Sequence, residues 1–228
     1  MITSRDNEAL KLVRKLLAQR KHREETGLFA AEGEDLVEAA REAGIEPVHL
    51  LVAGETVEEA LLARVSTLPH PAREIGVYRR ADLPTGARDT CLALWRLVDP
   101  GNVGTLLRTA DAFGACVALS DGCADPLAPK ALRASAGAIF RTPIVGWDDR
   151  PPRCVALVAH DGAALSEADL TSPVTLLLGA ERAGLPDEQV SGCHKATIPV
   201  VDGAESLNVA AAGAIALYEA ARAGTSGA

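Results

Sequence analysis

The chain has 228 residues, a hydrophobic fraction of 48% and a formal net charge of −8. This length allows a buried core in one large domain or two modest ones. No run of about 18 uncharged apolar residues is present, the N-terminus lacks the basic-then-apolar pattern of a secretory signal, and the net charge opposes indiscriminate attraction to nucleic acid. These features argue against a membrane protein and predict a cytoplasmic one.

The first part of the chain predicts a small α/β unit. Leu10, Val13 and Leu17 recur at helical spacing, which predicts a helix over residues 6–18. The other elements predicted here are, in chain order, a strand at 28–31, a helix at 34–43, a strand at 48–52, a helix at 56–63 and a strand at 75–78. Together they predict a first domain over residues 1–80.

A basic segment overlaps the first predicted helix. Six cationic residues and His22 lie there with no acidic residue among them, namely Lys11, Arg14, Lys15, Arg20, Lys21 and Arg23. Charge pattern alone favours a solvated helix face. The alternative is a local patch that contacts phosphate groups despite the negative total charge.

Residues 81–89 mix charges with Pro84 and Gly86 and have no hydrophobic period, which predicts a linker. Short apolar runs follow at 91–98, 115–120, 154–160 and 174–178, with a mixed run at 195–201. Continuous rather than alternating hydrophobicity is typical of strands covered on both faces, so these runs predict an α/β fold with a mainly parallel sheet. The alanine-rich segment 208–223 predicts a final helix, either packed inside or at a subunit interface.

The five cysteines predict free thiols rather than a disulfide framework. They form no Cys-x-x-Cys pair and lie in mostly apolar surroundings, at Cys91, Cys116, Cys123, Cys154 and Cys193. Cys193 and His194 are adjacent, but a second pair of ligands at metal spacing is missing. The sequence therefore predicts no metal site.

Segment 99–114 follows the predicted strand at 91–98 and carries Asn102 and Arg108. Arg108 falls off the apolar face of the predicted helix. Each residue has an ordinary alternative role, Asn102 as a helix cap and Arg108 as an ion-pair partner of Asp111. At the end of a strand, both could instead address an anionic or hydroxyl-bearing ligand.

Two further segments, 176–185 and 198–209, set apolar residues against glycine-containing turns and small polar side chains. Gly179 and Gly184 let the main chain approach a ligand closely, although an ordinary strand-to-helix turn also uses glycine. An α/β protein presents its binding groups at strand ends in this way. We interpret the three segments as one divided active site.

In order and spacing, segments 99–114, 176–185 and 198–219 resemble the three signatures of the SpoU family of RNA ribose methyltransferases, within the SPOUT superfamily. The likeness covers nearly all of residues 90–222, and residues 27–36 resemble part of the substrate-binding domain often attached to these enzymes. The resemblance implies an RNA-binding domain at 1–80 and a catalytic domain with a deep trefoil knot at 90–228. It also implies a homodimer with its sites near the interface.

The implied activity is S-adenosylmethionine-dependent methylation of a ribose 2′-hydroxyl of tRNA or rRNA. By the resemblance, the cofactor contacts fall on Leu178, Gly179, Glu181, Gly184, Ile198, Ser206, Leu207 and Asn208. The catalytic set is Arg108, Asn102, Glu181, Ser206 and Asn208. The basic segment, with Lys11, Arg14, Lys15, Arg20, Lys21 and Arg23, would contact RNA phosphates.

Some of these roles have alternatives. A guanidinium offers a planar donor fork and rarely loses its proton, so we predict that Arg108 anchors RNA phosphate and orients the hydroxyl, while the family leaves a role in proton removal open. Glu181 could be a plain surface charge, and Ser206 and Asn208 could be helix caps.

The chain departs from the family pattern at Asp99, where asparagine is common, at Arg182, where glycine is frequent, and at Asp202. Asp99 and Asp202 add negative charge near a site meant for RNA. With 3% aromatic residues, recognition of RNA shape and backbone is favoured over reading unpaired bases. A catalytically silent RNA-binding or assembly protein is the alternative function; an oxidoreductase is disfavoured because no Gly-x-Gly-x-x-Gly follows a strand.

Overall fold

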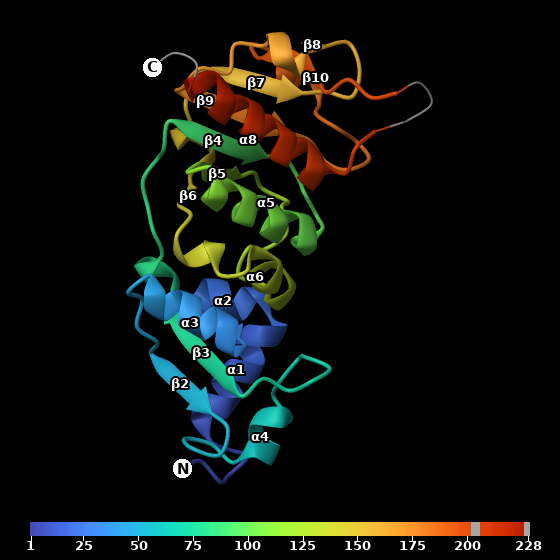
Figure 1. Ribbon diagram of the computed structural model, residues 1–228. Coiled ribbons are helices and arrows are strands. Elements are labelled where there is room, and N and C mark those ends of the chain that lie inside the picture. The colour runs from blue at the N-terminus through green and yellow to red at the C-terminus, as the bar shows by residue number, and fades with distance from the viewer. Residues whose placement is uncertain (202–205, 226–228) are drawn as a thin grey trace.

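The computed structural model describes residues 1–201 and 206–225, which form two α/β domains stacked end to end in Figure 1. The first domain is built on an antiparallel sheet of order β1-β3-β2. Its elements are α1 (Glu8–Ala18), α2 (Arg20–Thr26), β1 (Leu28–Glu32), α3 (Glu34–Glu42), β2 (His49–Val52), α4 (Glu59–Ala63) and β3 (Glu74–Arg79). The Oδ1 atom of Asn7 caps α1 by accepting from the Ala9 N–H at 2.9 Å.

The second domain contains a parallel sheet of order β6-β5-β4-β9-β7-β10-β8, which confirms the predicted α/β class with a mainly parallel sheet. Its strands are β4 (Thr90–Leu94), β5 (Cys116–Leu119), β6 (Ile144–Val145), β7 (Cys154–Leu157), β8 (Ala163–Ala164), β9 (Val174–Leu178) and β10 (His194–Thr197). Its helices are α5 (Pro100–Ala112), α6 (Pro129–Ser135), α7 (Asp187–Val190) and α8 (Val209–Thr225).

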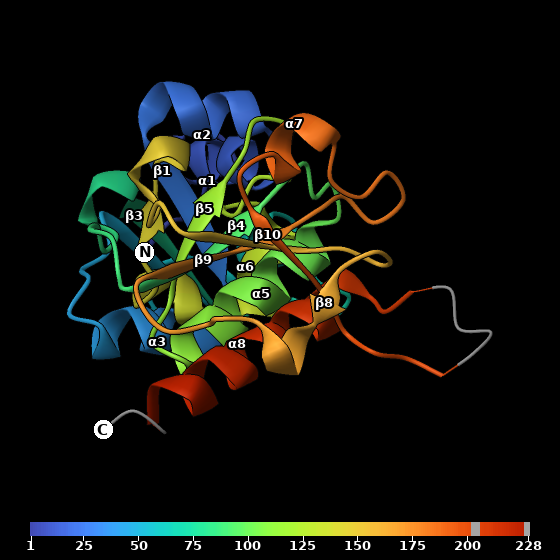
Figure 2. The same cartoon turned by 90° about the horizontal axis from the view of Figure 1, so that it is seen from above.

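The two faces of this sheet are covered differently, with α5 and α8 along one face and α7 on the other (Figure 2). Successive strand residues point to opposite faces, so Leu92 and Leu94 pack under α5 and α8, while Cys91 and Ala93 join the face that receives Val190 of α7. Burial on both faces accounts for the continuous apolar runs in the sequence.

The two domains share one core. Phe29, Tyr78 and Phe140 bring their ring centroids within 5.2–6.0 Å of one another, and all three are buried. Aromatic pairs at this spacing contribute more than their buried area alone. The first domain is therefore packed directly on the second, and the linker is not the only connection between them.

Local geometry explains where the elements differ from expectation. Gln19 has extended backbone (φ −126°, ψ 113°), which ends α1 and starts the separate helix α2. The helix predicted over 56–63 begins only at Glu59, because Val57 forms β-bridges with Ile2 and Ala53. β6 and β8 have two residues each, too few to give a sequence period.

Two expectations from the sequence, the knot and the position of Asp202, are not tested by the described residues. The trefoil knot that the resemblance implies near the C-terminus stays a prediction, and Asp202 of the third segment lies outside the described residues. None of the described helices has the length and hydropathy needed to cross a bilayer. All five cysteines are free thiols, and no metal-binding group of His, Cys, Asp or Glu occurs over residues 1–201 and 206–225.

Candidate active site at the carboxyl ends of β7 and β9

A pocket of about 400 Å³ opens where the chain leaves β7 and β9. It is lined by all eight residues predicted to contact a cofactor, namely Leu178, Gly179, Glu181, Gly184, Ile198, Ser206, Leu207 and Asn208. They come from the second and third sequence segments, and Asn102 of the first segment reaches the same place through a hydrogen bond to Glu181. Three segments separated in sequence thus meet at one pocket; residues 202–205 of the third are outside the described part.

The glycines of the second segment shape one wall of this pocket. The main chains of Ala180 and Gly184 exchange two hydrogen bonds of 3.1 and 2.9 Å, which closes a tight loop after β9. A Cβ atom on Gly179 would come within 2.4 Å of the Gly184 carbonyl carbon, and Gly184 itself has φ +64°. Both positions therefore require glycine, the first for space and the second for its backbone conformation.

Asn102, Glu181 and Asn208 form a chain of hydrogen bonds at the pocket. Asn208 Nδ2 donates to Asn102 Oδ1 at 3.3 Å, and Asn102 Nδ2 donates to Glu181 Oε1 at 3.0 Å. Each amide thus holds the next side chain in one orientation. Glu181 is not an unattached surface charge, since its carboxylate accepts this bond.

Asn102 and Asn208 each had a helix cap as their alternative role, and only Asn208 acts as one. Asp99, not Asn102, is the N-cap of α5, and its Oδ1 accepts from the Asn102 N–H at 3.0 Å. Asn208 does act as a cap, because its Oδ1 accepts from the Ala210 N–H at 2.8 Å, and its Nδ2 is engaged with Asn102 at the same time. Ser206 lines the pocket.

The negative charge of Asp99 is compensated locally. Lys130 Nζ lies 2.7 Å from Asp99 Oδ2. The hydrogen bonds from Lys130 and from the Asn102 amide lower the pKa of Asp99. Its departure from the family pattern therefore adds less negative potential near the site than its formal charge suggests.

Arg108 is the one predicted catalytic residue that the structure does not bring to this pocket. It lies exposed on α5 and is absent from the pocket lining. The alternative pairing with Asp111 is also not observed, since Asp111 Oδ2 is bound by Arg141 at 2.8 Å. The Arg108 side chain therefore lies outside the pocket lining and has no ion-pair partner among the described residues.

The basic segment separates into three kinds of side chain. Lys11, Arg20 and Lys21 are exposed to varying degrees and pair with a glutamate of their own helical turn or its neighbour. Arg14 and Lys15 are exposed and form no ion pair over the described residues. These two keep the free charge that a phosphate contact needs.

The prediction that Arg23 contacts RNA is wrong in this structure. Only 6% of its side chain is exposed, its guanidinium lies 2.7 Å from Asp125 Oδ2, and it also donates to the Leu16 carbonyl. Asp125 belongs to the loop after β5, so Arg23 joins the two domains. Helix α2 follows the break at Gln19, and that change of direction turns Arg23 inward.

Leu157, Val158 and Ala159 also line the pocket, and the sequence did not single them out. The apolar run at 154–160 was predicted as a strand, and the three of its residues that line the pocket are all apolar, so none of them marks a site. Because β7 runs parallel to β9, its carboxyl end falls at the same edge as Gly179. Parallel topology is therefore the signal that could have found them.

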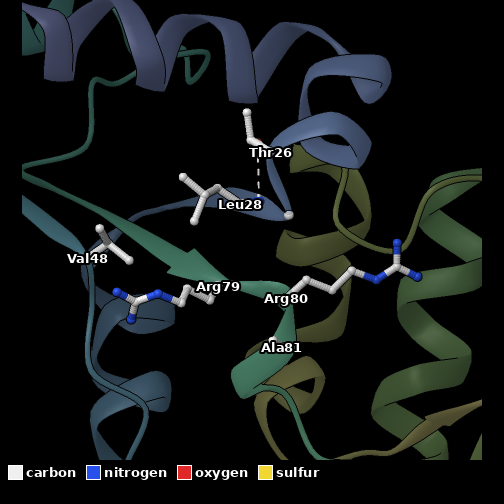
Figure 3. A pocket seen from close by; sticks show the side chains of 7 residues that line it. Thr26, Leu28, Val48, Arg79, Arg80 and Ala81 are labelled. Atoms are coloured by element: carbon white, nitrogen blue, oxygen red, sulfur yellow. Dashed lines mark hydrogen bonds between the residues drawn. The ribbon is translucent and has the colours of Figure 1, made fainter.

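A second hollow of about 590 Å³ lies in the first domain, next to the end of β3. Figure 3 shows Arg79 and Arg80 extending to opposite sides of the chain there, and Thr26 accepting from the Leu28 N–H at 3.3 Å. Its lining holds two cations but no acidic residue or amide. It lacks the convergent polar set of the pocket beside β9, which makes the smaller pocket the better candidate for chemistry.

Comparison with known families agrees with this division of the chain. The sequence model described as "SpoU rRNA Methylase family" matches residues 89–218. A second one, described as "MRM3-like substrate binding domain", matches residues 7–77. The first match contains the whole parallel sheet and the second contains nearly all of the antiparallel one.

Similar proteins cover almost the full chain. A 23S rRNA (guanosine(2553)-2'-O)-methyltransferase, RlmP, of Bacillus subtilis is 30% identical over 95% of this chain and 97% of its own. The AdoMet-bound rRNA methyltransferase of Sinorhizobium meliloti superposes with a TM-score of 0.84 at 32% identity, covering 97% of both chains. The SpoU methyltransferase AviRb of Streptomyces viridochromogenes, also in complex with AdoMet, has a TM-score of 0.82 at 27% identity, covering 95% of this chain and 97% of that one.

Proposed function

The chain belongs to the SpoU rRNA methylase family, and on this premise we propose that it transfers the methyl group of S-adenosylmethionine to a ribose 2′-hydroxyl of ribosomal RNA or tRNA. The observation that carries the proposal is the pocket beside β9, which gathers Gly179, Ile198, Leu207 and Asn208 within a matched catalytic domain. We place the reaction in the cytoplasm, where such RNA substrates are met.

The pocket fits S-adenosylmethionine in size and in chemistry. A volume of about 400 Å³ lies within the usual range of small-molecule sites. Leu178, Ile198 and Leu207 offer apolar surface suited to an adenine ring, and the closed Gly179–Gly184 loop brings main-chain groups to the rim. Ser206 and Asn208 supply polar side chains for the amino-acid end.

When bound, this cofactor supplies a sulfonium methyl: the C–S bond breaks as the O–C bond to the ribose forms, and the hydroxyl proton leaves. The chain's task is to hold the 2′-oxygen in line with that methyl group, and positioning alone is worth several kcal/mol. Glu181 is fixed at the pocket by Asn102, and Asn102 by Asn208. We assign this chain of side chains to orienting the hydroxyl and accommodating its proton.

We further propose a homodimer in which Arg108 of one subunit serves the pocket of the other. Arg108 is exposed on α5 and does not line its own pocket. On the neighbouring helix α8, Ile215 and Tyr218 are 38% and 56% exposed on one face, which is a suitable apolar contact for a second copy. A guanidinium supplied in this way would clamp the RNA phosphate.

Mixed subunits test this arrangement. Arg108→Ala and Asn208→Asp homodimers are each expected to be nearly inactive. Unfolding and refolding them together should restore about a quarter of the wild-type rate, because half of the dimers then hold one intact site. Recovery at the background rate would contradict a site shared between subunits. An Arg108→Lys variant with full turnover would show that the planar fork is not needed.

RNA selection is assigned to the first domain, where Arg14 and Lys15 of α1 are the two cations of the basic segment that form no ion pair with a described residue. Neutralising both should weaken RNA binding and lower its salt dependence by about one unit of slope per charge. Neutralising Lys11 and Lys21, which already pair with Glu8 and Glu25, is the matched control.

The activity is tested by incubating the protein with methyl-labelled S-adenosylmethionine and total bacterial RNA, then mapping the methylated nucleotide. The expected result is label on a single ribose 2′-oxygen. Calorimetric binding of the cofactor without any RNA label would favour a catalytically silent RNA-binding protein of the same fold. Absence of cofactor binding would overturn the assignment of the pocket.

A further inference from the structure

The only two tryptophans of the chain lie together at the carboxyl ends of the parallel strands. Trp95 follows β4 and Trp147 follows β6, and their ring centroids are 5.6 Å apart at an angle of 51°. Both rings are partly exposed. The backbone N–H of Trp95 donates to the carbonyl of Leu178, a pocket residue, at 2.8 Å, which extends the pairing of β4 with β9 by one residue. The pair therefore stands at the same sheet edge as the proposed methyl-transfer site.

An arginine guanidinium lies over the ring of each tryptophan. Arg96 Cζ lies 5.3 Å from the Trp95 ring centroid, and Arg150 Cζ lies 4.2 Å from that of Trp147. Neither arginine forms an ion pair with any residue that the structure describes. Arg150 also donates to the Trp147 carbonyl, and the exposed Asp148 and Asp149 lie between these two residues in the sequence. Two indoles and two guanidiniums thus form a cluster of four planar groups, in a chain whose net charge is −8.

Arg96 is held in an unusual backbone conformation. Its φ is +49°, a region that a residue with a side chain rarely adopts. The Arg96 N–H donates to Ser120 Oγ at 2.9 Å, which fixes the strained turn. Glycine would occupy this position without strain, so an arginine here has a stability cost that packing alone does not explain. Backbone strain of this kind is concentrated at functional sites.

We propose that Trp95, Arg96, Trp147 and Arg150 form a nucleotide-binding site for the substrate RNA, in which an unpaired base near the methylated ribose stacks on the cluster. RNA bases stack on indole rings and on guanidinium planes, and arginine charge attracts the adjoining phosphate. The inference rests on the proposed function. It also departs from the expectation that recognition of RNA shape and backbone is favoured over reading unpaired bases, because the few aromatic residues include this partly exposed pair.

Tryptophan fluorescence, excited at a wavelength that tyrosine does not absorb, reports on this site alone, since it contains both tryptophans. The probe is a single-stranded 12-nucleotide oligoadenylate, compared with an abasic ribose-phosphate oligomer of equal length and with polyglutamate. Saturable quenching by oligoadenylate, at least about tenfold tighter than by the abasic oligomer, is expected from base stacking. Equal affinity for the abasic oligomer, or for polyglutamate as a mimic of an acidic protein, would overturn the proposal.

Variants separate binding from folding. In anisotropy measurements with labelled oligoadenylate, Trp147→Leu and Arg150→Gln are each expected to bind about tenfold more weakly. Arg96→Gly should also weaken binding while its melting temperature equals or exceeds that of the wild type, because the strain is relieved. A merely structural cluster predicts unchanged RNA affinity in Arg96→Gly, and that result would refute the site.

Two controls keep this inference distinct from the proposed function. Arg64→Gln removes an exposed charge at the end of α4 and should leave RNA affinity unchanged. All variants should bind S-adenosylmethionine with wild-type affinity in calorimetry. If the wild type methylates RNA but the cluster variants bind it normally, the site fails and the enzyme assignment stands; if the wild type does not methylate RNA, the assignment itself fails.

Discussion

Asn208 has two functions that a single exchange can separate. Its Oδ1 caps α8 at Ala210, and its Nδ2 donates to Asn102. Asn208→Asp keeps a capping oxygen but removes the donor and sets a negative charge against the Asn102 oxygen. We expect stability to change by less than about 0.5 kcal/mol and the methyl-transfer rate to fall about tenfold or more. Denaturant unfolding and a methyl-transfer assay of the variant and the wild type check this. Equal methyl-transfer rates would mean that the hydrogen bonds joining Asn208, Asn102 and Glu181 do not contribute to the reaction.

Gly179 is the residue whose side-chain space is most restricted at the pocket. A Cβ atom there meets the Gly184 carbonyl carbon at 2.4 Å and its oxygen at 2.6 Å, and these backbone atoms belong to the closed loop. Gly179→Ala must therefore open the loop, and we expect cofactor affinity to drop at least about tenfold by calorimetry. Gly224→Ala, with nothing within 4 Å, is the control. Wild-type affinity in Gly179→Ala would show that loop closure does not shape the binding site.

At the scale of elements, α2 is attached to the catalytic domain by a buried ion pair, Arg23–Asp125, and by a hydrogen bond from Arg20 to the Cys123 carbonyl. Arg23 is 6% exposed and Asp125 is 13% exposed in their side chains. Asp125→Asn leaves the guanidinium without a counter-charge, so we expect unfolding free energy to fall by about 3 kcal/mol in urea titrations. The double variant Arg23→Met with Asp125→Leu should recover most of that loss. Glu24→Gln, which breaks the exposed pair with Arg20, should change stability by less than about 1 kcal/mol.

The sequence predicted helices and strands well where a hydrophobic pattern extends over enough residues to be recognised. The spacing of Leu10, Val13 and Leu17 located α1, and the continuous apolar runs located β4, β5, β7 and β9. It did not predict the break at Gln19, because extended backbone at one residue leaves no periodic trace. The same limit applies to the β-bridges of Val57, which depend on Ile2 from a distant segment.

At the scale of the whole molecule, the order of the motifs predicted which residues meet at the pocket, but not which side chains lie around it. The glycines at 179 and 184 and the amides at 102 and 208 come together because parallel strands end at one edge. The helical pattern correctly placed Arg108 off the apolar face of α5, but it did not reveal that this residue lies outside the pocket lining. The tryptophan cluster depends on β6 lying beside β5, and the two residues of β6 are too few to predict that pairing.

Tyr78 is buried in the core shared by the two domains, and its hydroxyl has no hydrogen-bond partner among the described residues. Burial raises the pKa of Tyr78 to about 12, against about 10 for an unfolded tyrosine. Below pH 10 both states are neutral at this residue, and its contribution to stability is complete. Between pH 10 and 12 the unfolded state ionises first, so this contribution falls by about 1.4 kcal/mol per pH unit.

Tyr78→Phe removes both the ionisation and the unpaired hydroxyl. At pH 8 the variant should be as stable as the wild type or more stable by about 1 kcal/mol, because an unsatisfied buried polar group is lost. Its advantage should then grow as the pH rises from 10 to 12 in urea unfolding measured at each pH. Tyr218→Phe, at a site that is 56% exposed, controls for the general alkaline loss of stability. Parallel curves for Tyr78→Phe and the wild type would mean that the hydroxyl reaches water before the chain unfolds, and that the two domains separate locally around this shared core.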